Sequence, residues 1–419
     1  MSPVRPGVQV IGRRLEPGDH ELRDFLTRTA QPHEYLDAGT PEADALLAER
    51  GLTGAPLPVV LEPGVALTGV TVASLAQAWG ASAPPSREHY DLLIVGAGPA
   101  GLAAAVYAAS DGLSTVVIEE DVPGGQASHT SLIENYFGFP DGIGGAELAR
   151  LAGRQAEKFG AELVFLRGVV GSRLGEAGRP LVQISGGYEV SADVLLAAPG
   201  MQWRRLEVSG MEELLGRGTY YGAGRSEATQ CGGDEVIVIG AGNSAGQAVM
   251  NLGDAGAHVT MVVRGDTLTK SMSAYLVDRI EQHPLIDVRL RTQVTALHDR
   301  DGELAGVTIT DAGGAAQERH ARALFACIGG LPRTSWAANA GVQTDRNGFL
   351  CTGPDLLEGG RRPDGWAPDR DPLPLEASVP GLFAAGDVRS GSTKRVGSAV
   401  GEGAMAVALI HRRLAELQA

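Results

Sequence analysis

The sequence predicts an α/β protein in which two similar β-α-β units follow a smaller α/β segment. Three observations predict this class. A buried-type strand followed by a glycine-rich turn begins at Asp91, and the same pattern returns at Glu235. Glycine accounts for 59 of the 419 residues, about twice the usual share. Such an excess indicates many tight turns and close backbone approaches.

The first 86 residues predict a small domain of their own. Apolar runs alternate with helically spaced apolar residues, and a proline-rich linker at 83–86 ends the segment. The expected strands cover residues 8–12, 32–37 and 57–61, with a turn at 62–64, and the expected helices cover residues 20–29, 41–50 and 72–79.

The first β-α-β unit carries a Gly-x-Gly-x-x-Gly turn between strand 91–95 and a helix ending at Ser110. In that context the first glycine permits the turn, the second lets the backbone approach a pyrophosphate, and the third allows close packing. The helix N-terminus offers unpaired N–H groups to phosphates. A strand at 115–118 is followed by Glu119, whose carboxylate can accept hydrogen bonds from ribose hydroxyls. The alternative interpretation of the unit is a tight turn that binds no ligand. The expected cofactor-binding residues are Gly96, Gly98, Pro99, Ala100, Gly101, Glu119 and Glu120.

The second unit aligns with the first without a gap, so the sequence predicts two Rossmann-like units and two dinucleotides. Its strands cover 235–239 and 259–263. Its second strand ends in Arg264 rather than an acid, which favours NADPH over NADH because arginine can face a 2′-phosphate, with Lys270 as a helper. The alternatives are a solvated surface arginine and a second unit that holds no nucleotide. The expected binding residues are Gly240, Gly242, Asn243, Ser244, Ala245, Arg264 and Lys270.

Composition excludes several classes of protein. Apolar residues make up 43% of the chain, enough for real cores, and the formal net charge of −15 argues against nonspecific binding to nucleic acid or an anionic membrane. The start of the chain has no charged-then-apolar leader, and no apolar run reaches the ~18 residues of a membrane span. We therefore expect a soluble, cytoplasmic protein with no nucleic-acid or membrane partner.

The three cysteines, Cys231, Cys327 and Cys351, form no C-x-x-C pair. This spacing excludes a local redox disulfide and a cysteine-based zinc site, and we expect no metal.

From Asp91 onward the chain resembles the thioredoxin reductase family of FAD- and NAD(P)-dependent flavoproteins. The two turns carry the resemblance together with Gly124-Gly125-Gln126, Ile133-Glu134-Asn135-Tyr136 and Gly386-Asp387-Val388. The resemblance implies FAD in the first unit, NADPH in the second and a homodimer. It also implies a discontinuous FAD domain, residues 87–201 and 327–419, with an inserted NAD(P)H domain at 202–326.

The resemblance further assigns roles to single residues. Glu119 would hold the adenosine ribose and Asp387 the ribityl–phosphate region. A helix starting near Ala399 would point its N-terminus at the flavin. The residues implied at the flavin are Gly125, Gln126, Asn135, Gly386, Asp387, Ala399 and Val400.

The chain departs from this family where a redox C-x-x-C is expected. Tyr221 and Gly224 stand in the places of the two cysteines, and a phenol and a glycine cannot cycle between dithiol and disulfide. Thioredoxin reduction is therefore doubtful, and the flavin itself must meet its acceptor: oxygen, a quinone, another redox protein or a small oxidised substrate. Tyr220, Tyr221 and Arg225 are the pocket candidates, although Tyr221 could instead only fill the gap.

Two other functions stay open. Without cysteine pairs the chain could be a flavin-bound sensor or docking protein with negligible turnover. Because its basic 2′-phosphate cluster is thin, it could also be an oxidase that uses FAD alone.

Residues 1–86 resemble a glutaredoxin or thioredoxin-like domain, in which the proline of Leu57-Pro58-Val59 would be cis. Arg13-Arg14-Leu15-Glu16 stands where the active C-x-x-C would be, so the domain looks redox-inactive. Its expected role is docking or dimer support, against recognition of a thiol-bearing partner. A long insert at 353–374 is expected to be a solvated loop, against a lid or partner contact.

Overall fold

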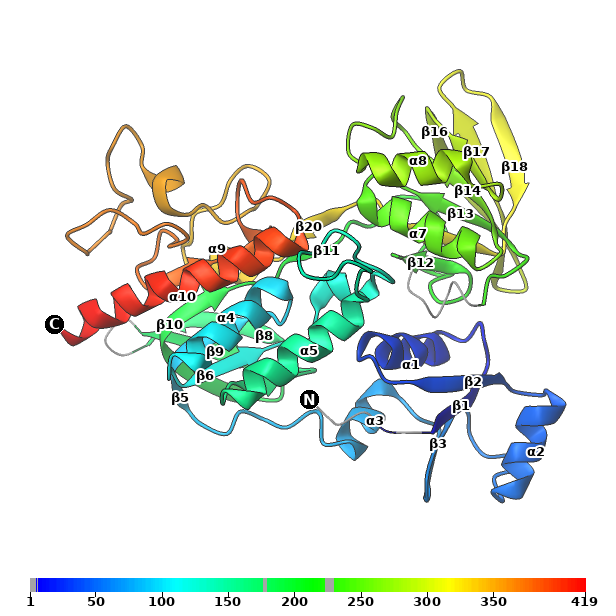
Figure 1. The fold of residues 1–419 in the computed structure, drawn as a ribbon, viewed down its shortest axis with the longest axis horizontal. Helices are drawn as coiled ribbons and strands as arrows, with labels where there is room; N and C mark the ends of the chain where they lie inside the picture. The colour runs from blue at the N-terminus through cyan, green and yellow to red at the C-terminus, as the bar shows by residue number, and fades with distance from the viewer. Residues whose placement is uncertain (1–4, 6, 176–178, 223–229) are drawn as a thin grey trace.

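The computed structural model describes the whole chain except residues 1–4, 6, 176–178 and 223–229. The chain forms three α/β bodies, the third inserted between two parts of the second, and two of them are built around parallel sheets (Figure 1).

The N-terminal domain has a four-stranded sheet in the order β2-β1-β3-β4. β1 and β2 are parallel, whereas β3 runs antiparallel to both β1 and β4. α1 begins at Pro17, three residues before the expected start, because proline is favoured in the first helical turn. β4 was not expected: Pro63-Gly64 makes a hairpin turn that returns the chain along β3. The Leu57–Pro58 peptide is cis, as expected. The elements are β1 Val8–Gly12, α1 Pro17–Arg28, β2 His33–Asp37, α2 Pro41–Glu49, β3 Val59–Glu62, β4 Val65–Thr68 and α3 Val72–Ala78.

The second body contains the first β-α-β unit. Its central strands β7-β6-β5-β10 are parallel, and β21 pairs in parallel with the end of β10. β9 and β8 complete the sheet as an antiparallel hairpin. α4 packs between α5 and α10 (Figure 1). The elements are β5 His89–Val95, α4 Pro99–Ser110, β6 Thr115–Ile118, the 3₁₀ helix η1 Gly125–His129, α5 Gly145–Lys158, β7 Glu162–Val164, β8 Val169–Leu174, β9 Pro180–Ile184, β10 Tyr188–Ala197, α9 Ser335–Asn339, η3 Gly353–Leu356, β21 Leu382–Ala384, η4 Gly386–Val388 and α10 Val396–Gln418.

The third body contains the second unit on a parallel sheet in the order β12-β19-β13-β14-β15, flanked by a three-stranded antiparallel sheet. Two short strands, β11 and β20, pair where the chain crosses between the second and third bodies. The elements are β11 Met201–Trp203, β12 Thr219–Tyr221, β13 Glu235–Ile239, α7 Asn243–Asp254, β14 His258–Val262, α8 Ala274–Gln282, β15 Ile286–Arg289, β16 Thr292–Arg300, β17 Glu303–Asp311, β18 Ala316–His320, β19 Ala323–Ala326 and β20 Gly330–Pro332.

The predicted mixed α/β class with two Rossmann-like sheets is therefore confirmed. The domain boundaries expected at 86, 201 and 326 stay predictions. Among the residues that the structure describes, no helix is both long and apolar enough to cross a bilayer.

Candidate functional site

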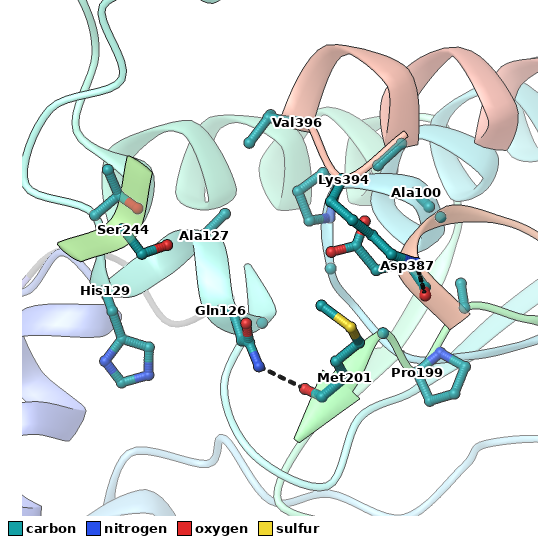
Figure 2. A pocket seen from close by; sticks show the side chains of 18 of the residues that line it. Ala100, Gln126, Ala127, His129, Pro199, Met201, Ser244, Asp387, Lys394 and Val396 are labelled. Carbon is teal, nitrogen blue, oxygen red and sulfur yellow. Dashed lines mark hydrogen bonds between the residues drawn. The ribbon is translucent and has the colours of Figure 1, made fainter. Parts of the chain in front are cut away.

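A cavity of about 510 Å³ opens beyond the carboxyl ends of β5 and β10, where the N-termini of α4 and α10 converge (Figure 2). In Figure 2, Ala100, Asp387 and Lys394 lie at one end of the cavity and His129 and Ser244 at the other. Thirteen of the expected residues line it: Gly98, Pro99, Ala100, Glu119, Glu120, Gly125, Gln126, Asn135, Asn243, Ser244, Gly386, Asp387 and Ala399.

The first turn has the shape that a phosphate group needs. Gly98 faces open space, since a Cβ built there would meet nothing within 4 Å, and α4 begins at the next residue. Gly96 has a φ of +103°, and a Cβ there would lie 2.3 Å from the Ala198 carbonyl oxygen. A Cβ on Gly101 would lie 1.9 Å from the Gly96 carbonyl oxygen. The second glycine thus leaves room for a ligand beside a helix N-terminus, and the other two are required by packing.

Glu119 lies at the end of β6, beside this turn. Its carboxylate accepts hydrogen bonds from the backbone N–H groups of Ala97 at 2.7 Å and Asp121 at 3.0 Å. Burial raises the pKa of Glu119, and these two donors offset only part of that effect. Each carboxylate oxygen keeps a second lone pair, which can accept a ribose hydroxyl.

A smaller cavity of about 210 Å³ continues beyond Glu119. Glu119, Glu120, Pro199 and Arg333 line both cavities, and Gly96 lines the smaller one. Glu120 is held by a two-pronged ion pair with Arg333. The two spaces together suit an elongated ligand whose middle lies at the glycine turn, as in a dinucleotide.

Asp387 occupies the opposite end of the main cavity. Within the described part of the chain no donor reaches its carboxylate, although Lys394 donates to its backbone carbonyl. Burial raises the pKa of Asp387, and the charge of Lys394 opposes that shift. A half-buried carboxylate without a donor is suited to accept a hydrogen bond from a ligand hydroxyl. Together with the glycine cradle and Glu119, this arrangement fits FAD.

The second turn also fits a dinucleotide. A Cβ on Gly240 would lie 2.3 Å from the Cys327 carbonyl oxygen, whereas Gly242 faces open space in front of α7. Ala245 is buried in the core of its sheet. Arg264 and Lys270 are exposed, and Lys270 precedes Ser271, which donates to the Ala241 carbonyl at 2.9 Å. Asn243 and Ser244 line the main cavity, so residues that follow both glycine turns meet there.

The tyrosine candidates do not line the cavity. The Tyr220 ring is stacked on that of Phe325, with centroids 5.1 Å apart. Its centroid also lies 4.8 Å from that of the His20 ring in the N-terminal domain. The Tyr221 hydroxyl donates to Glu212 at 2.8 Å. Tyr221 is thus part of a polar network outside the cavity. Val400, which was expected at the flavin, does not line the cavity either. Arg225 lies outside the described residues.

Several lining residues, among them Met201, Trp203 and Arg28, were missed by the sequence reasoning. The Met201 carbonyl accepts a hydrogen bond from the Gln126 amide at 2.8 Å, and Trp203 lies edge-on to His129 with ring centroids 5.9 Å apart. Arg28 reaches the cavity from the N-terminal domain. Nothing local in the sequence marks these residues, because tertiary contacts bring them to the site.

No cysteine lines either cavity. Cys231 and Cys327 are buried, and burial raises the pKa of the Cys327 thiol to about 12. The described residues contain no group of three or more side chains suited to hold a metal ion.

Comparison with known proteins places the chain in a family. The family model described as pyridine nucleotide-disulphide oxidoreductase matches residues 90–403. Thioredoxin reductase of Bacillus subtilis (strain 168) is 33% identical over 332 residues, which cover 78% of this chain and 96% of that protein. The solved thioredoxin reductases of T. acidophilum and Lactococcus lactis are 28% and 27% identical, with TM-scores of 0.69 and 0.68. Each match covers 78% of this chain and 99% of the other. The chain therefore belongs to the thioredoxin reductase-like pyridine nucleotide-disulphide oxidoreductases.

Proposed function

We propose that this protein is an FAD-dependent oxidoreductase that takes hydride from NADPH and passes electrons directly to its acceptor, without a cysteine relay. The observation that carries the proposal is a cavity lined from both nucleotide-binding units and by no cysteine. When bound, FAD supplies the two-electron chemistry that joins NADPH to an acceptor.

The protein's own residues would bind and orient the two dinucleotides. Gly98 and the N-terminus of α4 would hold the FAD pyrophosphate, Glu119 the ribose, and Asp387 a ribityl hydroxyl. Gly242 and the N-terminus of α7 would hold the NADPH pyrophosphate, with Arg264 and Lys270 near its 2′-phosphate. The walls formed by Gln126, Met201 and Ser244 would exclude water from the meeting point of the two ligands.

The surroundings of residues 220–222 support direct transfer to an acceptor. α1 covers this region: His20 contacts Tyr220, and a Cβ on Gly216 would lie 3.0 Å from Pro17. A Cβ on Gly222 would meet the Trp203 ring at 3.1 Å. Residues 220–222, which include the first of the two cysteine positions, are thus packed from two sides, and this favours a small acceptor reaching the cavity over a docked protein disulfide.

The test begins with anaerobic NADPH, which should bleach the flavin band of the purified protein, faster than NADH does. Oxygen, a quinone and small oxidised substrates are then compared as reoxidants, with thioredoxin as the disulfide control. A variant with Cys231→Ala, Cys327→Ala and Cys351→Ser should keep its turnover with the best small acceptor. An unbleached spectrum at saturating NADPH would refute the proposal, and loss of turnover in the folded cysteine variant would refute direct transfer.

A second candidate is a flavin-bound sensor or docking protein, which the absence of both cysteine pairs favours. It predicts reduction by NADPH with negligible reoxidation by every acceptor in the panel. By family resemblance we also propose a homodimer, which sedimentation velocity would test.

A further inference from the structure

The N-terminal domain reaches the wall of the cofactor cavity through the segment at residues 121–129. This segment contributes Asp121, Gly125, Gln126 and His129 to the lining of the cavity. It contains adjacent glycines, of which Gly124 has a φ of +104° and Gly125 a φ of +52°. A segment rich in glycine needs outside contacts to keep one conformation.

On one side, residues 121–129 are held by the second body, which contains the first β-α-β unit. The Gly124 N–H donates to the Ala97 carbonyl at 2.7 Å, and a Cβ on Gly125 would lie 3.5 Å from the Gly98 Cα. Gly125 is therefore placed directly against the phosphate-binding turn.

On the other side, α1 of the N-terminal domain holds the same segment. Arg28 is 8% exposed, and its guanidinium lies 2.8 Å from the Asp121 carboxylate. Asp24 lies 3.7 Å from the His129 ring nitrogen. Val122 is 2% exposed and packs in the core of the N-terminal domain with Leu22 and Leu26.

Two consecutive hydrogen bonds link α1 to Gly125, the residue that lies against the phosphate-binding turn. Arg28 Nε donates to the Ser128 hydroxyl at 3.0 Å, and that hydroxyl donates to the Gly125 carbonyl at 2.7 Å. Ser128 is 4% exposed, so water does not replace either bond. The planar guanidinium can serve Ser128 and Asp121 together because its donors point in fixed directions.

We propose that Arg28 is a positioning residue for the FAD site. Through Ser128, Arg28 holds Gly125 in the conformation that binds the cofactor. The N-terminal domain is then a part of the flavin site rather than only a docking module. This inference rests on the proposed function, since it assumes that FAD binds beside Gly98.

Two variants separate positioning from simple domain docking. Ser128→Ala removes the link to Gly125 and leaves the Arg28–Asp121 ion pair in place. Arg28→Lys keeps a positive charge beside Asp24 and Asp121 but has no Nε donor for Ser128. Arg14→Gln is the matched control, because Arg14 joins the N-terminal domain to Asp234 of the third body at 3.1 Å and does not touch residues 121–129.

The experiment titrates each apoprotein with FAD and records the dissociation constant, the visible spectrum of the bound flavin and the melting temperature. We expect Ser128→Ala and Arg28→Lys to raise the FAD dissociation constant about tenfold and to shift the flavin band. We expect Arg14→Gln to stay within about twofold of the wild type, the scatter expected of a distant site. Unchanged affinity and spectrum in both test variants would overturn the inference, as would an equal loss in Arg14→Gln. A wild-type apoprotein that takes up no FAD would instead refute the proposed function.

Discussion

At the scale of the residue, the cavity depends on acids that are costly to bury. Asp387 has its pKa raised by burial, so its ionised form destabilises the folded apoprotein. A raised pKa means that the folded state binds the proton more tightly than the unfolded state does. This cost is therefore absent well below the ordinary value of 3.8 and develops as the pH rises above it.

We predict that Asp387→Asn binds FAD about tenfold more weakly but leaves the apoprotein equally or more stable at neutral pH. The amide removes the half-buried charge and accepts a hydrogen bond from a ribityl hydroxyl less strongly. Urea unfolding of the apoprotein at neutral and acid pH and FAD titration check the two effects. The stability difference should vanish at acid pH, where wild-type Asp387 is protonated; a variant less stable than wild type at neutral pH would contradict the argument.

Arg264 gives a second prediction at this scale. If it faces the 2′-phosphate, Arg264→Ala should raise the KM for NADPH about tenfold and leave the KM for NADH nearly unchanged. The measurement is flavin reduction at varied concentrations of each nucleotide. Arg289, an exposed arginine paired with Asp287, provides an Arg→Ala control on the same sheet. Equal effects on both nucleotides would mean that Arg264 is only a surface charge.

Local sequence predicted the glycine turns and Glu119, because the residues around a turn and a strand end determine both features, whereas Asp387 was expected only from the family resemblance. It did not predict Arg28 or Trp203, which reach the site through contacts between distant parts of the chain. It placed Tyr221 near an acceptor pocket by its position in the family motif. The structure instead ties its hydroxyl to Glu212 and the Leu206 N–H.

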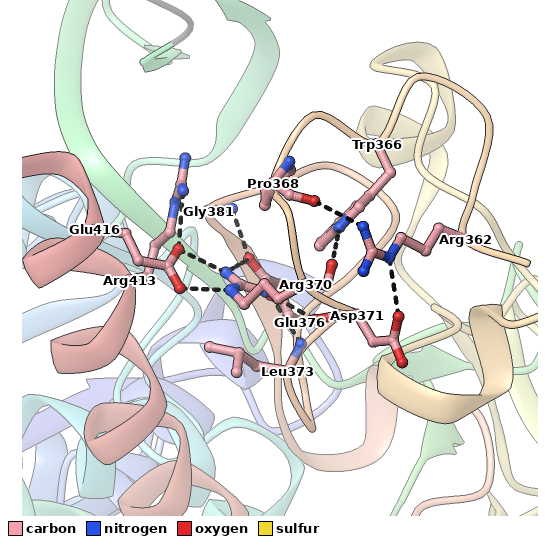
Figure 3. A network of polar contacts seen from close by, with 10 residues as sticks. All are labelled: Arg362, Trp366, Pro368, Arg370, Asp371, Leu373, Glu376, Gly381, Arg413 and Glu416. Atoms are coloured by element: carbon pink, nitrogen blue, oxygen red, sulfur yellow. Dashed lines mark hydrogen bonds and ion pairs between the residues drawn. The ribbon is translucent and has the colours of Figure 1, made fainter. Parts of the chain in front are cut away.

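At the scale of the element, the insert at 353–374 is anchored at its C-terminal end (Figure 3). Arg370 pairs with Glu376 at 2.6 Å and also with Glu416 of α10. Glu376 is fully buried and accepts the N–H groups of Leu373 and Gly381. No residue of the insert lines either cavity, so this loop is no lid over the candidate site in this arrangement.

We predict that Arg370→Met destabilises the protein by about 3 kcal/mol, because it leaves a buried carboxylate without its cation. Urea unfolding measures the change. Arg362 lies in the same insert, and its partners Asp369 and Asp371 are exposed, so Arg362→Met should change stability little. FAD affinity should stay unchanged in both variants; an equal loss of stability in the two would show that the buried pair has no special role.

At the scale of the whole molecule, the N-terminal domain contacts both nucleotide-binding bodies. α1 contacts α5 and reaches Ser128 of η1 through Arg28, and its His20 contacts Tyr220 of β12 (Figure 1). Arg279 of α8 pairs with Glu134 at 3.1 Å, and Asn243 and Ser244 line the cavity of the other body. The repeat in the sequence predicted the two sheets, but relative placement depends on side chains such as Arg14 and Arg279, whose partners no local pattern identifies.

This placement already brings the second turn to the FAD cavity, so hydride transfer should need no large rotation of the third body. Glu134→Cys and Arg279→Cys, joined by a short bismaleimide in a Cys351→Ser background, would fix the two bodies as they stand. Cys351 is replaced because it is the partly exposed native thiol, whereas Cys231 and Cys327 are buried. We expect the cross-linked protein to be reduced by NADPH at a rate similar to that of the same variant without the linker. If the linked form binds NADPH but its flavin stays oxidised, the two bodies must move apart or turn before hydride transfer. The contacts made by α1 would then oppose the reaction rather than prepare it.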